Sequence, residues 1–151
     1  MDRRDLVKSA LAAGAALAGT ALGSSAEAAS PTAAGVPRVV YHLSDVDKSA
    51  FVLGNIRYHI DGMGGPNHVT VALVVHGLAL RSFRAADHND AIAPAFDSLR
   101  REGVAFHACV HTMEGMKLTL EDLLPGFVVA EKGGVVKLAE LQAAGWLYLR
   151  P

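Results

Sequence analysis

Three residues with versatile side-chain chemistry, His42, His76 and Cys109, each end an apolar run that is typical of a buried strand. Imidazoles move protons and bind metals near neutral pH, and a cysteine thiolate is a nucleophile and a metal ligand. In open α/β sheets, ligands bind outside the carboxyl ends of the strands. We therefore expect these three side chains to lie close together at one edge of a sheet. The loop residues expected over the same edge are Ser44, Asp45, His111 and Thr112.

Cys109 is the only cysteine of the chain. A single cysteine cannot form an intrachain disulfide or supply a cysteine-rich zinc module. A short helix is predicted at about 112–116, and helix N-terminal amides or a nearby protonated histidine lower the pKa of a thiol. These features favour a nucleophilic Cys109. The alternative that Cys109 is only a small buried hydrophobic residue stays open, because free cysteine is among the most buried residue types.

The elements that would position these residues alternate between strands and helices. Ser44 and Asp47 predict a capping box that opens the first helix, and Thr119 with Asp122 forms a similar pair further along. The order βαβαβαβαβ predicts an α/β fold, in which a parallel sheet carries helices on both faces through right-handed crossovers. Strands are expected at 38–43, 68–76, 104–109, 127–130 and 146–149, and helices at about 44–63, 90–102, 112–116 and 134–144.

The composition excludes several classes of protein. The chain has 151 residues, with 14 Lys and Arg against 15 Asp and Glu and a formal net charge of −1. Because this balance includes no basic stripe, nucleic acid is not expected as a partner. An apolar content of 51% with 19% charged residues excludes a disordered chain. The length suits one domain with one substantial core.

Residues 1–28 have the layout of a signal peptide, with a positively charged start, an Ala/Gly-rich apolar segment and an A-x-A cleavage motif. Arg3 and Arg4, followed by DLVK, resemble the twin-arginine export consensus. The alternative is a membrane anchor, but the apolar segment is short and diluted by Gly and Thr. We predict cleavage near Ala28, a flexible lead-in over 29–37, and a periplasmic mature protein without membrane contact.

From residue 39 to its end, the chain resembles the DsrE/DsrF-like family of small sulfur-relay-type proteins. The order and spacing of several stretches carry the resemblance, although no single motif decides it. These stretches are VVYHLSD at 39–45, LGNI at 53–56, VVHG at 74–77, ACVHTM at 108–113 and LLPGFVV at 123–129.

The resemblance implies a three-layer α/β/α sandwich over 38–151 with a five-stranded parallel sheet. It also implies assembly into homotrimers or homohexamers, and a cysteine at the position of Cys109 that carries sulfane sulfur as a persulfide. Those relatives work in the cytoplasm with partner subunits and acceptor proteins. This chain departs from them in its export signal and in His111, where many relatives have Asn.

The leading hypothesis is an exported protein that binds or transfers sulfur through Cys109, without an organic cofactor. It would exchange sulfur with a donor or acceptor protein, either as a sulfurtransferase-like enzyme or as a carrier without turnover of its own. A second hypothesis is a copper or zinc protein with His42, His76 and Cys109 as ligands. A third is a non-catalytic module that binds a small ligand or a partner. The residues expected to form the sulfur site are Cys109, His42, His76, His111 and Thr112.

Overall fold

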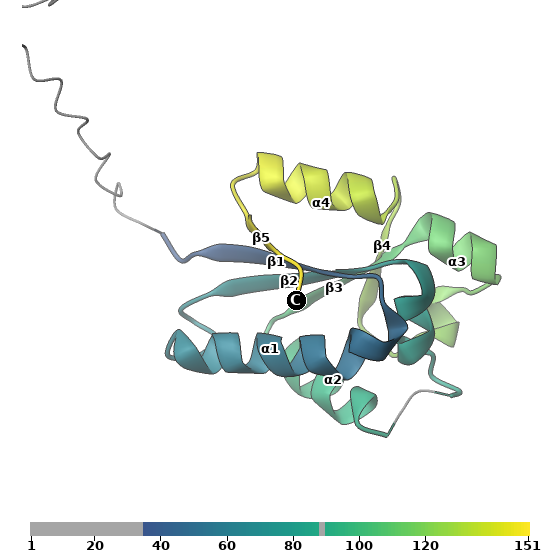
Figure 1. Cartoon of the computed structure of the whole chain (residues 1–151), viewed down its shortest axis with the longest axis horizontal. Helices are drawn as coiled ribbons and strands as arrows, with labels where there is room; N and C mark the ends of the chain where they lie inside the picture. Colours follow the sequence, from purple (N-terminus) through teal and green to yellow (C-terminus); the bar gives the residue numbers. More distant parts are fainter. Residues whose placement is uncertain (1–34, 88–89) are drawn as a thin grey trace, which may run out of the picture. The chain divides into compact units, whose positions relative to one another are not determined.

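Five parallel strands form a single sheet in the order β4-β3-β2-β1-β5 (Figure 1). The computed structural model describes residues 35–87 and 90–151, so the predicted signal peptide and most of the predicted lead-in lie outside the described residues. Within the described residues, the predicted α/β fold with a five-stranded parallel sheet is confirmed. The strands are β1 (Arg38–Leu43), β2 (Thr70–Val75), β3 (Ala105–Cys109), β4 (Phe127–Ala130) and β5 (Leu147–Leu149).

Helices cover both faces of the sheet, with α1 and α2 on one face and α4 on the other (Figure 1). The chain steps from β1 to β4 in one direction and then returns to place β5 beside β1. Because crossovers between parallel strands are right-handed, the returning helix lies on the opposite face, which gives three layers. The helices are α1 (Ser49–Gly62), α2 (Ile92–Arg101), α3 (Val110–Met116) and α4 (Gly134–Ala143), with short 3-10 helices η1 (Val46–Lys48), η2 (Gly77–Phe83) and η3 (Leu120–Asp122).

The larger hydrophobic core lies between the sheet and the layer of α1 and α2. Phenylalanine rings from different elements pack together at its centre, where they contact one another edge-on or stacked. The ring centroid of Phe96 lies 4.2 Å from that of Phe106 and 5.2 Å from that of Phe127. Phe83 adds a further edge contact, with its centroid 5.4 Å from that of Phe127. These rings pack α2 against β3 and β4 and thereby stabilise the position of β3, which ends at Cys109.

The core on the α4 face is much smaller. Successive residues of a strand point to opposite faces, so Tyr41 enters the larger core while its neighbour His42 faces α4. Since few apolar side chains fill this side, polar groups occupy the space near the carboxyl edge. The buried members of the smaller core are Val40, Ala72, Val74 and Leu138.

Two predicted boundaries at the carboxyl edge differ from the structure. β2 ends one residue before His76, because Gly77 adopts a positive φ of 59° and begins η2. His76 still has extended backbone, and its N–H donates to Leu43 O at 3.0 Å, so the residue continues the line of β2. α3 begins directly after Cys109 rather than at residue 112, which makes Cys109 its N-cap residue.

The two predicted capping pairs have different outcomes. Ser44 and Asp47 form no capping box, since the chain enters η1 without a side-chain cap. The Ser44 hydroxyl oxygen instead accepts an N–H from Arg150 at 2.9 Å. Thr119 and Asp122 do form a capping box, at the start of η3. A spacing of three residues therefore identified one cap correctly and one wrongly.

We expect Phe96→Ala to lower the free energy of unfolding by about 3 to 5 kcal/mol, the usual cost of removing a buried aromatic ring. Phe96 is only 2% exposed, so its removal leaves a cavity between α2 and the sheet. Denaturant unfolding followed by circular dichroism measures the change. Phe51→Ala is the matched control because Phe51 is 60% exposed on α1. An equal loss in the two variants would contradict this account of the core.

Candidate functional site

The sheet register places Cys109, His76 and His42 on the α4 face near the carboxyl edge. Val75 pairs with Ala108, so the next residues along, His76 and Cys109, are neighbours on adjacent strands. His42 lies one strand further, opposite Val74, and both of these residues face α4. The structure thus brings together the three side chains that end the first three apolar runs.

The Cys109 thiol lies where two chain segments turn their backbone N–H groups toward it. Burial raises the pKa of the thiol, since the residue is only 6% exposed. Hydrogen bonds from the backbone N–H groups of Gly134, Thr112 and His111 and from the Thr112 hydroxyl outweigh that effect. The net result is a Cys109 pKa below its usual value of 9.0, which favours the nucleophilic thiolate.

Thr112 connects the thiol to the loop after β2. Its hydroxyl oxygen accepts the N–H of Gly77 at 2.9 Å. The hydroxyl proton is therefore available to donate to the Cys109 sulfur. Because the same side chain contacts η2 and the thiol, it fixes the first turn of α3 against the line of β2.

Gly133 and Gly134 allow the first turn of α4 to approach Cys109. A Cβ atom at position 134 would lie 3.2 Å from Cys109 Cβ and 3.2 Å from His76 Cβ. Gly133 has a φ of 96°, which L side chains rarely adopt, and a Cβ there would lie 2.9 Å from His111 Cδ2. A side chain at position 134 would require these neighbours to shift by a few tenths of an ångström, whereas glycine lets its N–H reach the thiol without such a shift.

His42 and His76 form a hydrogen-bonded pair beside the thiol. Their Nε2 atoms are 2.5 Å apart, and the ring centroids are 4.7 Å apart with 23° between the ring planes, so the two rings meet end to end. The Tyr148 hydroxyl lies 2.6 Å from His42 Nδ1. Burial, and then the neighbouring charges of His76 and Arg150, lower the pKa of His42 to about 4, although Asp45 opposes the shift. Burial also lowers the pKa of His76, so both rings are neutral at pH 7.

A family model described as the DsrE/DsrF-like family matches residues 38–151. The chain belongs to the DsrE/DsrF-like family. No curated protein matches the chain. This membership agrees with the five-stranded parallel sheet.

Solved structures of similar fold cover the same part of this DsrE/DsrF-like chain. A protein of unknown function from Methanobacterium thermoautotrophicum, MTH1491, has 26% identity and a TM-score of 0.67 over 76% of this chain and 99% of its own. The ychN protein from E. coli has 15% identity and a TM-score of 0.59 over 76% and 98%. BT1422 from Bacteroides thetaiotaomicron has 13% identity and a TM-score of 0.58 over 76% and 94%. The last two likenesses show the fold alone.

The His111 ring lies against Gly133 at the exposed side of this DsrE/DsrF-like site, where a Cβ on Gly133 would be 2.9 Å from its Cδ2. Its ring is 70% exposed, and its Nδ1 lies 3.5 Å from Glu114 Oε2. Its contribution to the thiol is the backbone N–H, which any residue type other than proline would supply. His107 lies on the same face as Cys109 and earlier along β3, and its Nδ1 is buried without a hydrogen-bond partner among the described residues. Burial, and then the charge of Lys137, lower the pKa of His107.

Sequence reasoning missed two residues that contribute to the site around Cys109, namely Gly134 and Tyr148. Gly134 is the first residue of the helix expected at 134–144, and no role beside the thiol was predicted for it. A glycine pair directly between a strand and a helix was the available signal, because it marks close backbone approach. Tyr148 was placed in the last strand, but no pattern in the sequence indicated that this strand pairs with β1 and brings the hydroxyl to His42.

The metal hypothesis finds no support in the geometry. In residues 35–87 and 90–151, no group of three or more His, Cys, Asp or Glu side chains is arranged to hold a metal ion. The Nε2 atoms of His42 and His76 are directed at each other, so they do not converge with Cys109 on a common point. The described residues therefore do not support a copper or zinc site formed by His42, His76 and Cys109.

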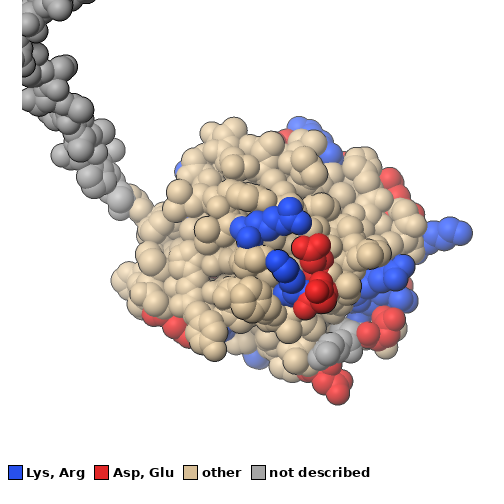
Figure 2. All heavy atoms as spheres, in the orientation of Figure 1, with Lys and Arg blue, Asp and Glu red and all other residues tan. Residues whose placement is uncertain are grey.

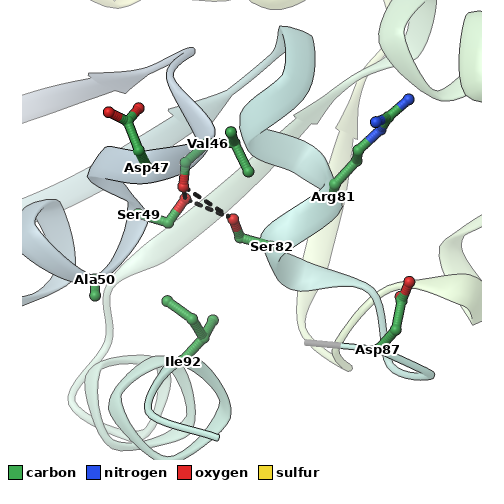
Figure 3. A pocket seen from close by; sticks show the side chains of 8 residues that line it. All are labelled: Val46, Asp47, Ser49, Ala50, Arg81, Ser82, Asp87 and Ile92. Carbon is green, nitrogen blue, oxygen red and sulfur yellow. Dashed lines mark hydrogen bonds between the residues drawn. The ribbon is translucent and has the colours of Figure 1, made fainter. Parts of the chain in front are cut away.

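A separate cavity of about 390 Å³ lies at the start of α1, near η2 and α2 (Figure 3). At its wall, the Ser49 hydroxyl donates to Val46 O at 2.9 Å and lies 2.8 Å from the Ser82 hydroxyl (Figure 3). The two hydroxyls are hydrogen-bonded to each other. Cys109 does not line this cavity. The cavity therefore adds no reactive group to the site around the thiol.

We expect Gly134→Ala to raise the pKa of the Cys109 thiol, because the added Cβ pushes the α4 N–H away from the sulfur. The pH dependence of alkylation by iodoacetamide, followed by mass spectrometry, measures this pKa. In the wild type the alkylation rate should rise at a pH below 9.0, and in the variant at a higher pH than in the wild type. Gly54→Ala is the matched control, since a Cβ there meets nothing within 4 Å. Identical profiles for Gly134→Ala and wild type would contradict the assigned role of the α4 N–H.

We expect the folded protein to lose stability as the pH falls from about 6.5 to about 4. The ordinary histidine pKa is 6.5 and that of folded His42 is about 4, so the unfolded chain binds the proton first in this interval. His42→Asn removes this group and should make the free energy of unfolding depend less steeply on pH there. Urea unfolding at a series of pH values measures the slope. Equal slopes in variant and wild type would show that His42 titrates normally.

Proposed function

We propose that the protein binds or transfers sulfane sulfur through Cys109, which carries the sulfur as a persulfide. The observation that carries the proposal is the set of backbone N–H groups from Gly134, Thr112 and His111 around a thiol whose pKa they lower. Membership of the DsrE/DsrF-like family supports the same chemistry, because its better-understood members carry sulfur on a cysteine at this position.

The loading step needs no group beyond the thiolate and a sulfur donor. The Cys109 thiolate attacks the outer sulfur of a polysulfide or of thiosulfate, and a new S–S bond forms. The S–S bond of the donor breaks, and its electron pair leaves with the shortened polysulfide or with sulfite. In the persulfide, Cys109 Sγ stays beside the backbone N–H groups and the new outer sulfur carries the negative charge. Attack by an acceptor thiolate on the outer sulfur would return the Cys109 thiolate.

We further propose that this chemistry takes place in the periplasm, after export by the twin-arginine route and cleavage near Ala28. The signal layout of residues 1–28 supports the proposal. Among the described residues, no helix is long and apolar enough to span a bilayer. Partners in sulfur exchange would then be a donor or an acceptor in that compartment.

We also propose that the chain assembles into a homotrimer or homohexamer. Large apolar side chains lie exposed beside one another on the edge strand β5, with Leu147 at 63% and Leu149 at 40% exposure. An uncovered apolar edge strand favours association. On the face drawn in Figure 2, basic and acidic side chains lie side by side, so no field of one sign opposes the approach of a second copy.

We expect thiosulfate or polysulfide treatment to add the mass of one or more sulfur atoms to the wild type and nothing to Cys109→Ser. Since Cys109 is the only cysteine, intact-protein mass spectrometry assigns the adduct without peptide mapping. Loss of the added mass on cyanide treatment or reduction identifies it as sulfane sulfur. Thermal unfolding of Cys109→Ser and Cys109→Ala establishes that the variants are folded.

A wild-type protein that stays unmodified, and whose folded thiol is inert to iodoacetamide, would overturn this function. That result would favour a binding module in which Cys109 only packs. Reaction of iodoacetamide without sulfur loading would also overturn it, because a reactive thiol alone does not make a sulfur carrier.

A further inference from the structure

A further cavity, of about 560 Å³, lies between η2 and the C-terminal end of α3. It adjoins the cavity drawn in Figure 3, because Arg81 and Asp87 line both. Figure 3 shows the Arg81 side chain directed away from the two serines of that first cavity. The charged residues that line the further cavity are Arg81, Arg84, Asp87, Lys117 and Asp122.

Both carboxylates of this cavity already have partners. Asp87 Oδ2 accepts an N–H from Arg84 at 3.1 Å. Asp122 Oδ2 accepts the backbone N–H of Thr119 at 2.8 Å and the Thr119 hydroxyl at 3.1 Å. These bonds, the backbone one first, lower the pKa of Asp122, so its charge is permanent at neutral pH and belongs to the capping box. The remaining charges of the cavity are therefore positive.

Arg81 and Lys117 are the cations of this cavity that form no ion pair in the part of the chain that the structure describes. They come from different elements, since Arg81 lies in η2 and Lys117 is the C-cap residue of α3. Lys117 has a φ of 55°, and among the described residues it alone combines a side chain with a positive φ. Glycine is the usual residue at such a helix end, because a side chain is strained there. The strained position thus carries a cation where glycine would fit more easily.

Backbone hydrogen bonds fix the two walls that carry these cations. The Leu124 N–H donates to Phe83 O at 2.8 Å, which ties the end of η2 to the segment after η3. The Leu118 N–H donates to Met113 O at 2.8 Å and closes the end of α3. Because the walls are already ordered, a ligand between them would bind without the cost of ordering the backbone.

We propose that this cavity binds a small anion with two or more carboxylate or phosphate groups, held between Arg81 and Lys117. A guanidinium binds such groups through paired N–H donors, and an ammonium binds them as a point charge. Two cations on different elements favour a ligand with more than one negative group. The volume of about 560 Å³ lies within the range of ligand pockets, about 300 to 1,000 Å³. The proposal is independent of the sulfur chemistry, since Cys109 does not line this cavity.

Isothermal titration calorimetry of the full chain with citrate, and separately with pyrophosphate, tests the proposal. We expect saturable binding of at least one of them at low ionic strength, and the one that binds decides between a carboxylate and a phosphate ligand. Arg81→Gln and Lys117→Gln should each weaken that binding at least about tenfold, the usual effect of losing a hydrogen bond to a charged group. Lys137→Gln is the matched control and should keep the wild-type affinity, because Lys137 on α4 also lacks an ion pair among the described residues but lies outside this cavity.

Lys117→Gly separates the loss of charge from a loss of folding. Glycine adopts the left-handed conformation without strain, so this variant should be at least as stable as Lys117→Gln in thermal unfolding. It should still bind the anion at least about tenfold more weakly than the wild type. Wild-type affinity in Lys117→Gly or Arg81→Gln, an equal loss in Lys137→Gln, or no binding of either anion would overturn the proposal.

Discussion

The approach of the α4 N-terminus to the Cys109 sulfur is the contact on which the site depends. It exists because the chain returns from β4 to β5 across the face opposite to α1 and α2. That return starts α4 directly above the carboxyl end of β3, and Gly133 and Gly134 remove the side chains that would keep it away. The lowered pKa of the thiol follows from this topology together with two glycines.

Dipoles of backbone N–H groups, rather than ion pairs, stabilise negative charge at the site. His42 and His76 both have lowered pKa values, first of all because they are buried, so no imidazolium lies beside the thiolate at neutral pH. Backbone N–H groups instead stabilise the negative sulfur, and their strength does not change with pH. The pKa of the thiol in such a site does not depend on the titration of a neighbour, whereas a thiolate paired with an imidazolium depends on the titration of both groups.

The sequence was sufficient for the fold and for the placement of the main candidate residues at one sheet edge, because both depend on local patterns. Apolar runs that end in His42, His76 and Cys109 indicated the first three strands, and a parallel sheet then had to bring their ends to one edge. The ends of individual elements were less accurate, since His76 lies just beyond β2, where Gly77 turns the chain. Ser44 followed the pattern of a cap, but it contacts Arg150, a partner that sequence spacing cannot reveal.

What the sequence could not show are the contacts between elements distant in the chain. Tyr148 reaches His42 only because β5 pairs with β1 rather than with β4, its predecessor in the chain. His111, beside the cysteine in sequence, was expected in the site; its ring is exposed and lies against Gly133, and its backbone N–H reaches the thiol. Strand order, by contrast, brings Tyr148 to His42. In a parallel sheet the carboxyl edge gathers residues by strand order, so the topology adds Gly134 and His76 to the groups of His111 and Thr112 that follow Cys109 in the sequence.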